Sequence, residues 1–375
     1  MRLFWLNIHF RTAMAGWQLF GLDRHLLIYA LRRPLFMGLM RLTLALDHVF
    51  FPAFRHVEVR RPVFIIGHPR SGTTFLQLLL TQTGEFCTFK AWEIFLPSLV
   101  ARRLLRRTIE RRIEQGKATF FPAEVGHEVA LDQVEEDELL LAYANNTELI
   151  VSMSPLAFGD WDLSELSYPD DQPERRRRRT MAFLRSCYQR QIHWTGKTQV
   201  VGKMTYAAMR LRSLLAAFPD AKIVYVVRSP LETIPSHFTL ERNLFAHMWG
   251  PIPIPRARLD RFHRQRYQSS IAYYRYVEDL IEKGALPANQ FMAVSYDSLR
   301  ANLEATIERV MQFAGLELGP ALRLRIAEQG RAQKAYERKH QNLQLEEFGL
   351  TEERVRADLG FVFDKYGFDK YGVTA

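Results

Sequence analysis

Residues 62–76 decide the fold of this chain, and they read PVFIIGHPRSGTTFL. The apolar run Val63–Ile66 is typical of a buried strand, and it ends at Gly67, where a tight loop begins. The loop closes at Gly72 and leads into Phe75–Leu80, whose apolar residues predict a helix. Unpaired backbone N–H groups and the positive end of a helix dipole meet in such a loop, which therefore predicts a phosphate site.

The two glycines of this loop have the spacing of a nucleotide-binding P-loop, Gly-x-x-x-x-Gly. Thr73, however, occupies the position at which a nucleoside triphosphatase carries its lysine. The fixed positive charge lies inside the loop instead, at Arg70. This pattern predicts phosphate binding and argues against ordinary hydrolysis of ATP or GTP.

The composition is that of a folded, basic chain. With 375 residues, of which 47% are hydrophobic, the chain is long enough for one large α/β domain or two smaller ones. The formal net charge of +10 predicts anionic partners, such as anionic lipid headgroups or a polyanionic acceptor, although arginine clusters also cover solvated surfaces. Nucleic acid is not expected, because no recognition-helix, zinc-finger or RNP-type pattern accompanies the arginines.

Cysteine and histidine usage predicts no metal and a reducing compartment. The two cysteines, Cys87 and Cys187, form neither a disulfide framework nor a metal-ligand spacing. The histidines are scattered and make no HExxH or Cys/His cluster. No signal-peptide pattern precedes the first strand, so we expect a cytoplasmic protein.

Residues 1–58 are expected to form an amphipathic helical extension, followed by the main domain, residues 59–375. Residues 1–54 are rich in Trp, Phe and Met, but arginines interrupt them too often for a membrane span of about 20 apolar residues. Two interpretations remain open. The helices pack on the main domain, or they lie in a bilayer interface, which would place the protein peripherally on the inner face of a membrane.

Three further apolar runs predict core strands, and they are Val200–Lys203, Lys222–Val227 and Phe291–Tyr296. Helical patterns separate them, so we expect an α/β fold with a P-loop-like central parallel sheet flanked by helices on both faces. Residues 98–116, 174–192 and 210–218 carry such patterns, and residues 128–150 are also read as a helix, which carries the acidic cluster Glu135–Glu138. A run of four acidic residues is typical of a solvated helix face. Ligands of such sheets bind beyond the carboxyl ends of the strands.

The loop Gly67–Thr74, the strand that ends at Arg228, and Ser236 eight residues later together resemble the sulfotransferases that use 3′-phosphoadenosine-5′-phosphosulfate (PAPS). The segments Glu346–Glu353 and Asp364–Tyr366 are similar to the largely bacterial branch related to tyrosylprotein sulfotransferases. The resemblance covers residues 60–370 and implies a sulfotransferase that uses PAPS as co-substrate without a metal. A P-loop kinase or nucleotide hydrolase, and a non-enzymatic membrane-associated nucleotide-binding protein, are the alternatives.

The resemblance also implies roles for single residues. Lys203, at the end of its strand, would stabilise the moving sulfuryl group together with Arg70. In the family a Ser/Asp-Pro pair usually follows this lysine, whereas Met204-Thr205 follows it here. The residues implied to bind PAPS are Arg70, Ser71, Gly72, Thr73 and Thr74 at the 5′-phosphosulfate, and Arg228 and Ser236 at the 3′-phosphate. His68 lies either near the phosphosulfate or in solvent.

Sulfuryl transfer also needs a base that takes the proton of the acceptor hydroxyl. Glu93 is the first candidate, because the family carries an acidic residue just before a hydrophobic-Pro segment such as Leu96-Pro97. His127 is a second candidate, since imidazole titrates near neutrality. Glu136 or Glu138 of the acidic cluster is a third, and the sequence leaves the choice open.

Two aromatic segments either wall an apolar acceptor pocket or belong to an ordinary lid or core. They are Phe120–Pro122 and the stretch that includes Phe245, Met248, Trp249 and Pro251–Pro255. Together with the aromatic, basic N-terminal helices, they favour a lipid or another amphipathic hydroxyl compound as the acceptor.

Overall fold

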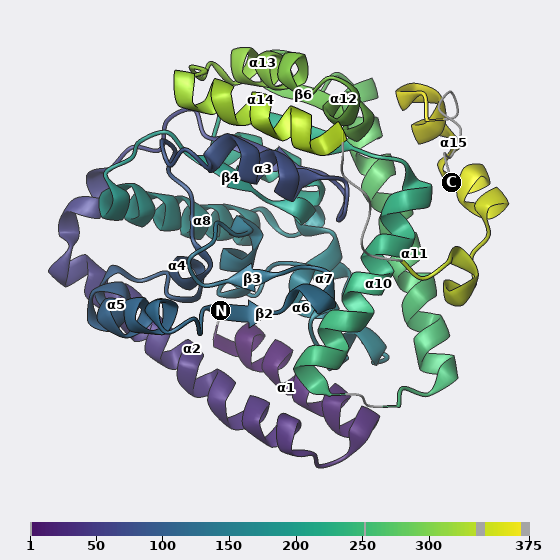
Figure 1. The fold of residues 1–375 in the computed structure, drawn as a ribbon. Coiled ribbons are helices and arrows are strands. Elements are labelled where there is room, and N and C mark those ends of the chain that lie inside the picture. The colour runs from purple at the N-terminus through teal and green to yellow at the C-terminus, as the bar shows by residue number, and fades with distance from the viewer. Residues whose placement is uncertain (1, 251–252, 335–341, 369–375) are drawn as a thin grey trace.

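The computed structural model describes residues 2–250, 253–334 and 342–368, and its centre is a four-stranded parallel sheet in the order β4-β1-β5-β6 (Figure 1). The strands are β1 (Val63–Ile66), β4 (Val201–Lys203), β5 (Lys222–Val227) and β6 (Phe291–Ser295). The four predicted strands are confirmed. Because all four are parallel, their carboxyl ends lie at one edge of the sheet.

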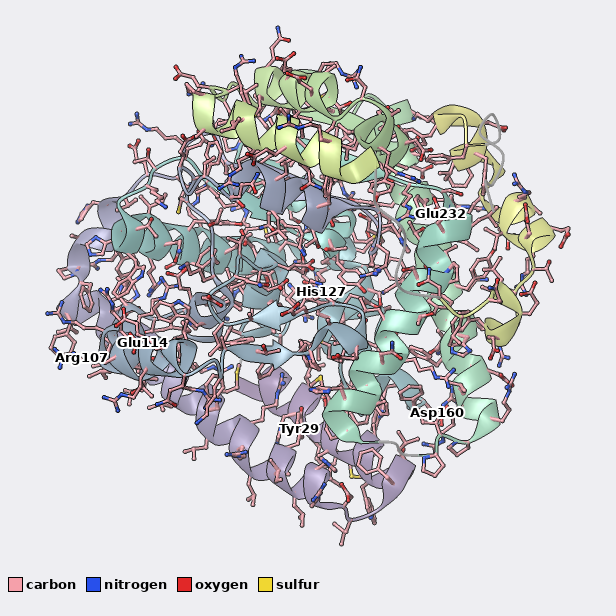
Figure 2. The ribbon with its side chains drawn as sticks, viewed as in Figure 1. Tyr29, Arg107, Glu114, His127, Asp160 and Glu232 are labelled. Atoms are coloured by element: carbon pink, nitrogen blue, oxygen red, sulfur yellow. The ribbon has the colours of Figure 1, made fainter. Side chains whose placement is uncertain are left out.

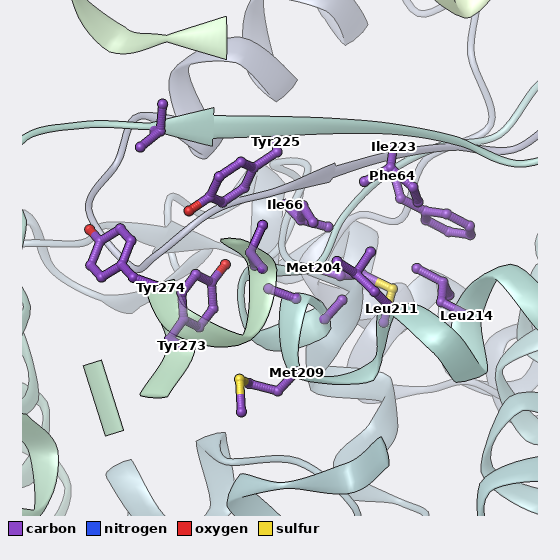
Figure 3. Packing of buried hydrophobic residues seen from close by; sticks show 14 of the residues in the cluster. Phe64, Ile66, Met204, Met209, Leu211, Leu214, Ile223, Tyr225, Tyr273 and Tyr274 are labelled. Atoms are coloured by element: carbon purple, nitrogen blue, oxygen red, sulfur yellow. The ribbon is translucent and has the colours of Figure 1, made fainter. Parts of the chain in front are cut away.

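Alternate side chains of β1 enter two different hydrophobic cores, one on each face of the sheet. Phe64 and Ile66 belong to the first core, and Val63 and Ile65 to the second. Figure 3 shows Phe64 and Ile66 among the methionine, leucine and tyrosine side chains of the first core. That core is covered by α8 (Glu174–Thr195), α9 (Leu211–Ala217), α10 (Pro230–Trp249), α11 (Arg256–Glu282) and α15 (Glu352–Tyr366), and the second by α3 (Thr73–Thr81), α12 (Tyr296–Ala301), α13 (Leu303–Ala314) and α14 (Pro320–Lys334).

Helix α1 (Arg2–Phe20) packs against the rest of the chain through an aromatic cluster. Its Ile8 and Ala15 share this cluster with Phe245 and Trp249 of α10, all of them buried. Phe245 and Trp249 are therefore core residues, as the second of the two interpretations of this stretch expected; Pro251 and Ile252 lie outside the described residues. In the described ranges, no helix combines the length and apolar character that crossing a bilayer requires.

Helix α2 (Arg24–Phe50) is attached through the buried carboxylate of Asp47. One Asp47 oxygen accepts from Ser98 Oγ at 2.8 Å and from Val100 N at 2.9 Å, which caps the start of α5 (Leu99–Glu114). The other forms an ion pair with Arg190 Nε of α8 at 2.6 Å. The N-terminal helices thus pack on the main domain through their inner faces, as the first of the two interpretations expected.

The segment 128–150 is not the regular helix that the sequence pattern predicted. It consists of strand β3 (Val129–Ala130), which pairs with β2 (Thr119–Phe121), a 3-10 helix at Asp137–Ala142 and the short α6 (Leu149–Ser152). Glu135, Asp137 and Glu138 are buried rather than solvated. Their cationic and phenolic partners come from distant parts of the chain, and such tertiary contacts override local helix propensity.

Candidate active site

Both loop glycines are required by close packing. A Cβ on Gly67 would collide with Val226 O and Ser71 Oγ. Gly72 has φ +100°, a conformation that disfavours side chains, and its Cβ would lie 2.5 Å from the ring of Tyr296. Gly72 is also the N-cap residue of α3, and a glycine has no side chain that could accept a hydrogen bond from the first N–H groups of the helix.

The buried hydroxyl group of Ser71 is a second feature of the loop that suits the binding of an anion. Ser71 is fully buried, and its Oγ has no hydrogen-bond partner among the described residues. Buried hydroxyl groups normally have a hydrogen-bond partner, so a ligand bound inside the loop would supply the partner that this hydroxyl group lacks. The oxygens of a phosphosulfate supply such acceptors.

Arg70 connects the loop with two distant segments. Its backbone has φ +72°, and its Nε donates to Ser236 Oγ on α10 at 3.0 Å. Its Nη1 donates to the carbonyl oxygen of Gly126, also at 3.0 Å. The structure therefore brings two predicted PAPS-binding residues into direct contact, although 166 positions separate them in the chain.

Arg228 lies beside the same loop at the carboxyl end of β5. Its Nη1 donates to the carbonyl oxygen of Arg70 at 3.3 Å, and its guanidinium lies 4.4 Å from the centre of the Tyr296 ring. Its Nε also pairs with Glu232 Oε2 at 3.1 Å, in the first turn of α10. An anion that binds Arg228 must therefore compete with, or add to, this carboxylate.

Lys203 reaches the loop from β4, the neighbour of β1. The side chain is 2% exposed, and its Nζ donates to Thr74 Oγ1 at 2.9 Å. Glu136 Oε2 lies 3.5 Å from the same Nζ and Glu135 Oε1 lies 3.7 Å from it. A buried ammonium ion thus lies between the start of α3 and two carboxylates.

The acidic cluster separates into two environments. Glu135 contacts His127 Nε2 at 3.1 Å, and Glu136 Oε1 accepts from the Thr205 N–H at 2.7 Å. Burial alone would raise the pKa of Glu135, but Lys203 and His127 lower it to about 2. Glu138 points elsewhere and pairs with the buried Arg210 at 3.2 Å. Only the acidic character of the run was visible in the sequence, and nothing there distinguished Glu135 or Glu136 from Glu138.

Glu93 has a different set of contacts. It lies in α4 (Ala91–Phe95), where its carboxylate accepts from the Lys90 N–H at 2.8 Å and from Gln191 Nε2 at 2.9 Å. It lines a cavity of about 340 Å³ that also includes Trp92 and Trp194. Across the described ranges, no hydrogen bond or ion pair joins Glu93 to the loop or to Lys203.

His68 is buried behind the loop, so its expected alternative position in solvent is wrong. Its ring is stacked on Tyr274 with 5.1 Å between ring centres, and Nε2 lies 3.0 Å from Ser270 Oγ. Nδ1 lies 3.0 Å from the carbonyl oxygen of Pro69, which only accepts, so Nδ1 carries the proton. Burial lowers the pKa of His68 to about 3, so the ring is neutral and positions the loop without adding charge.

Asp137 supports the strand that carries Lys203. Its Oδ2 accepts from Tyr188 Oη at 2.6 Å, and a Cβ on Gly202 would collide with both groups. Burial raises the pKa of Asp137 from 3.8 to about 8. Between these two values the folded protein holds a proton that the unfolded chain releases, so this group makes the free energy of unfolding fall as the pH rises.

We expect Asp137→Asn to weaken that pH dependence, because asparagine keeps the shape and cannot ionise. The free energy of unfolding should fall between pH 5 and pH 8 in the wild type. In the variant this decrease should be smaller by at least about 1 kcal/mol, since each shifted pKa unit corresponds to about 1.4 kcal/mol. Urea unfolding at several pH values measures the slope. Parallel slopes in the two proteins would show that Asp137 is ionised in the folded state.

Known proteins that are similar to this chain in sequence are sulfotransferases. A model of the sulfotransferase family matches residues 62–320. The omega-hydroxy-beta-dihydromenaquinone-9 sulfotransferase Stf3 of Mycobacterium tuberculosis, like that of Mycobacterium bovis, is 22% identical over 320 residues, which are 83% of this chain and 76% of the relative.

Two crystal structures share the fold. Sulfotransferase STF9 from Mycobacterium avium superposes with a TM-score of 0.69 at 19% identity, over 98% of this chain and 96% of that one. Sulfotransferase STF1 from Mycobacterium tuberculosis H37Rv gives a TM-score of 0.66 at 20% identity, over 95% and 92%. The family match spans the loop, Lys203, Arg228 and Ser236, and it favours sulfuryl transfer over the kinase and hydrolase alternative. The chain belongs to the sulfotransferase family.

Proposed function

We propose that the protein transfers the sulfuryl group of PAPS to a hydroxyl group of a lipid or another amphipathic acceptor. One observation carries this proposal: two cations from different segments lie at the same glycine-bounded loop. Arg70 is part of the loop, and Lys203 of β4 donates a hydrogen bond to Thr74 at its end. Stf3 supports the acceptor class, because its name specifies a hydroxylated menaquinone. Family membership supports the reaction.

In this reaction the bond between sulfur and the bridging phosphate oxygen of PAPS breaks, and a bond from sulfur to the acceptor oxygen forms. The leaving group is 3′,5′-adenosine bisphosphate. Arg70 and the N–H groups of Ser71–Thr74 would hold the 5′-phosphosulfate. Lys203 would stabilise the charge that develops on the bridging oxygen, and no metal has a role in this scheme. Arg228 and Ser236 would recognise the 3′-phosphate.

We infer that Glu136 is the base. Its Oε2 lies 3.5 Å from Lys203 Nζ, and the side chain keeps 14% exposure, so an acceptor can reach it. Glu135 is a weaker base, since Lys203 and His127 hold its pKa at about 2. Glu93 and His127 remain testable rivals, although the contacts of Glu93 attach it to α8 rather than to the loop.

Calorimetry with 3′,5′-adenosine bisphosphate tests the nucleotide site. The wild type should bind it, and Arg228→Ala should weaken binding about 10- to 100-fold, because a hydrogen bond to a charged group contributes about 1.5–3 kcal/mol. Binding of adenosine 5′-monophosphate, which lacks the 3′-phosphate, should change little. Arg325→Ala, which removes an exposed arginine of α14, is the matched control.

No binding by the wild type would contradict the proposed function. Equal losses for both nucleotides in Arg228→Ala would instead place this guanidinium at the 5′ end. The acceptor is sought with ³⁵S-labelled PAPS and a lipid extract. Label that appears only in water-soluble products would contradict a lipid acceptor.

A further inference from the structure

Helix α2 carries large apolar side chains on both of its faces. Leu26, Met37 and Met40 are buried against the rest of the molecule. A surface helix normally turns polar residues outward. Here the outward face bears Leu27, Ile28, Leu31, Leu35, Phe36, Leu39, Leu42, Val49 and Phe50, and Leu31 and Leu35 are 74% and 75% exposed.

This exposure is concentrated in one part of the molecule. Among the described residues, 18 large hydrophobic side chains are exposed, and 12 of them lie between Phe10 and Phe50. Scattered exposed leucines need no explanation, but a continuous apolar stripe marks a surface that is covered in function. At 27 residues, α2 is about 40 Å long, so the stripe extends far across the molecule.

The charge around the stripe is mostly positive, although Glu110 and Glu114 of α5 are also exposed. Helix α5 packs against α2, and the two helices together contain ten arginines and three acidic residues. Arg103, Arg107, Arg111 and Arg112 are exposed on α5, and Arg24 and Arg32 on α2. Figure 2 shows Arg107 and Glu114 on α5, next to α2. No acidic residue of α2 is exposed, since Asp47, its sole acid, is buried.

We propose that the outer face of α2, flanked by the arginines of α5, lies in the interface of an anionic lipid bilayer, with α2 parallel to the membrane plane. An interfacial helix combines these features, namely apolar side chains at the level of the acyl chains and basic residues at the headgroups. A second copy of this chain fits less well, because a symmetric pair would bring like charges together across the stripe. The proposal does not depend on the nucleotide chemistry.

Co-sedimentation of the full chain with vesicles tests this face. We expect binding to vesicles of phosphatidylcholine and phosphatidylglycerol, and weaker binding to phosphatidylcholine alone. Leu31→Ser/Leu35→Ser should reduce binding to both at least about tenfold, because each leucine loses its apolar transfer free energy. Arg107→Glu/Arg111→Glu should reduce binding about tenfold or more on the anionic vesicles only, since each basic residue near such a surface contributes about 1 kcal/mol.

The matched control is Leu78→Ser/Leu324→Ser, which removes two leucines that are exposed on α3 and α14. It should bind vesicles like the wild type. All variants should keep wild-type calorimetric binding of 3′,5′-adenosine bisphosphate, which separates this proposal from the proposed function. A wild type that does not sediment with anionic vesicles would overturn the proposal. So would a dimer in light scattering that Leu31→Ser/Leu35→Ser converts to monomers.

Discussion

Lys203→Ala should lower kcat about 10²- to 10³-fold, the usual cost of removing one preorganised group that stabilises developing charge. Lys203 Nζ lies 2.9 Å from Thr74 Oγ1, at the start of the helix that the phosphosulfate would face. The side chain is 2% exposed, and a buried charge acts more strongly than a solvated one. Single-turnover transfer from labelled PAPS measures the effect on the chemical step.

The same substitution also removes the cation beside Glu135 and Glu136. Breaking a buried ion pair costs several kcal/mol, so part of the protein could unfold. The free energy of unfolding is therefore measured alongside activity. The double variant Lys203→Ala/Glu135→Gln also removes one carboxylate that the first substitution leaves without its cation. It should be more stable than Lys203→Ala but equally slow in turnover. Lys117→Ala, at an exposed lysine, is the control. Near-normal kcat in folded Lys203→Ala would refute the stabilising role of this lysine.

Glu136→Gln should lower kcat about 10²- to 10⁴-fold, the range expected for loss of a general base. Binding of 3′,5′-adenosine bisphosphate should be nearly unchanged, because the amide keeps the size of the side chain. The acidic limb of the pH–kcat profile, which in the wild type reports protonation of the base, should also be lost. Rates are measured at saturating PAPS over a range of pH.

Glu93→Gln and His127→Asn distinguish the rival bases. We expect Glu93→Gln to keep most of kcat and to lose about 1 kcal/mol of stability, because its carboxylate accepts a backbone N–H at the start of α4. His127→Asn should change kcat less than Glu136→Gln, since His127 contacts Glu135, which in turn lies beside Lys203. A large loss in Glu93→Gln with normal turnover in Glu136→Gln would assign the base to Glu93.

Local patterns determined the sheet and the loop. Four short apolar runs bounded by turn residues predicted β1, β4, β5 and β6. The signal is clearest for the central strands β1 and β5, which are buried on both faces and are therefore apolar almost throughout. The spacing of Gly67 and Gly72, a local pattern, predicted a tight loop after β1, although two of the groups that exclude a Cβ there, Val226 and Tyr296, are distant in the chain. The strand ends then placed Lys203 and Arg228 at one edge of the sheet.

Only the tertiary structure decided which polar groups meet at that edge. Lys203 reaches Thr74 across 129 positions and Arg70 reaches Ser236 across 166, and no local periodicity encodes such contacts. For the same reason the acidic run was read as a solvated helix, whereas Glu135 and Glu136 belong to a non-helical segment whose buried charges depend on Lys203. The sequence alone thus determined a sheet with a glycine-bounded loop, because apolar runs and glycine spacing are local patterns. The charges around that loop depend on distant partners, and folding had to bring them together.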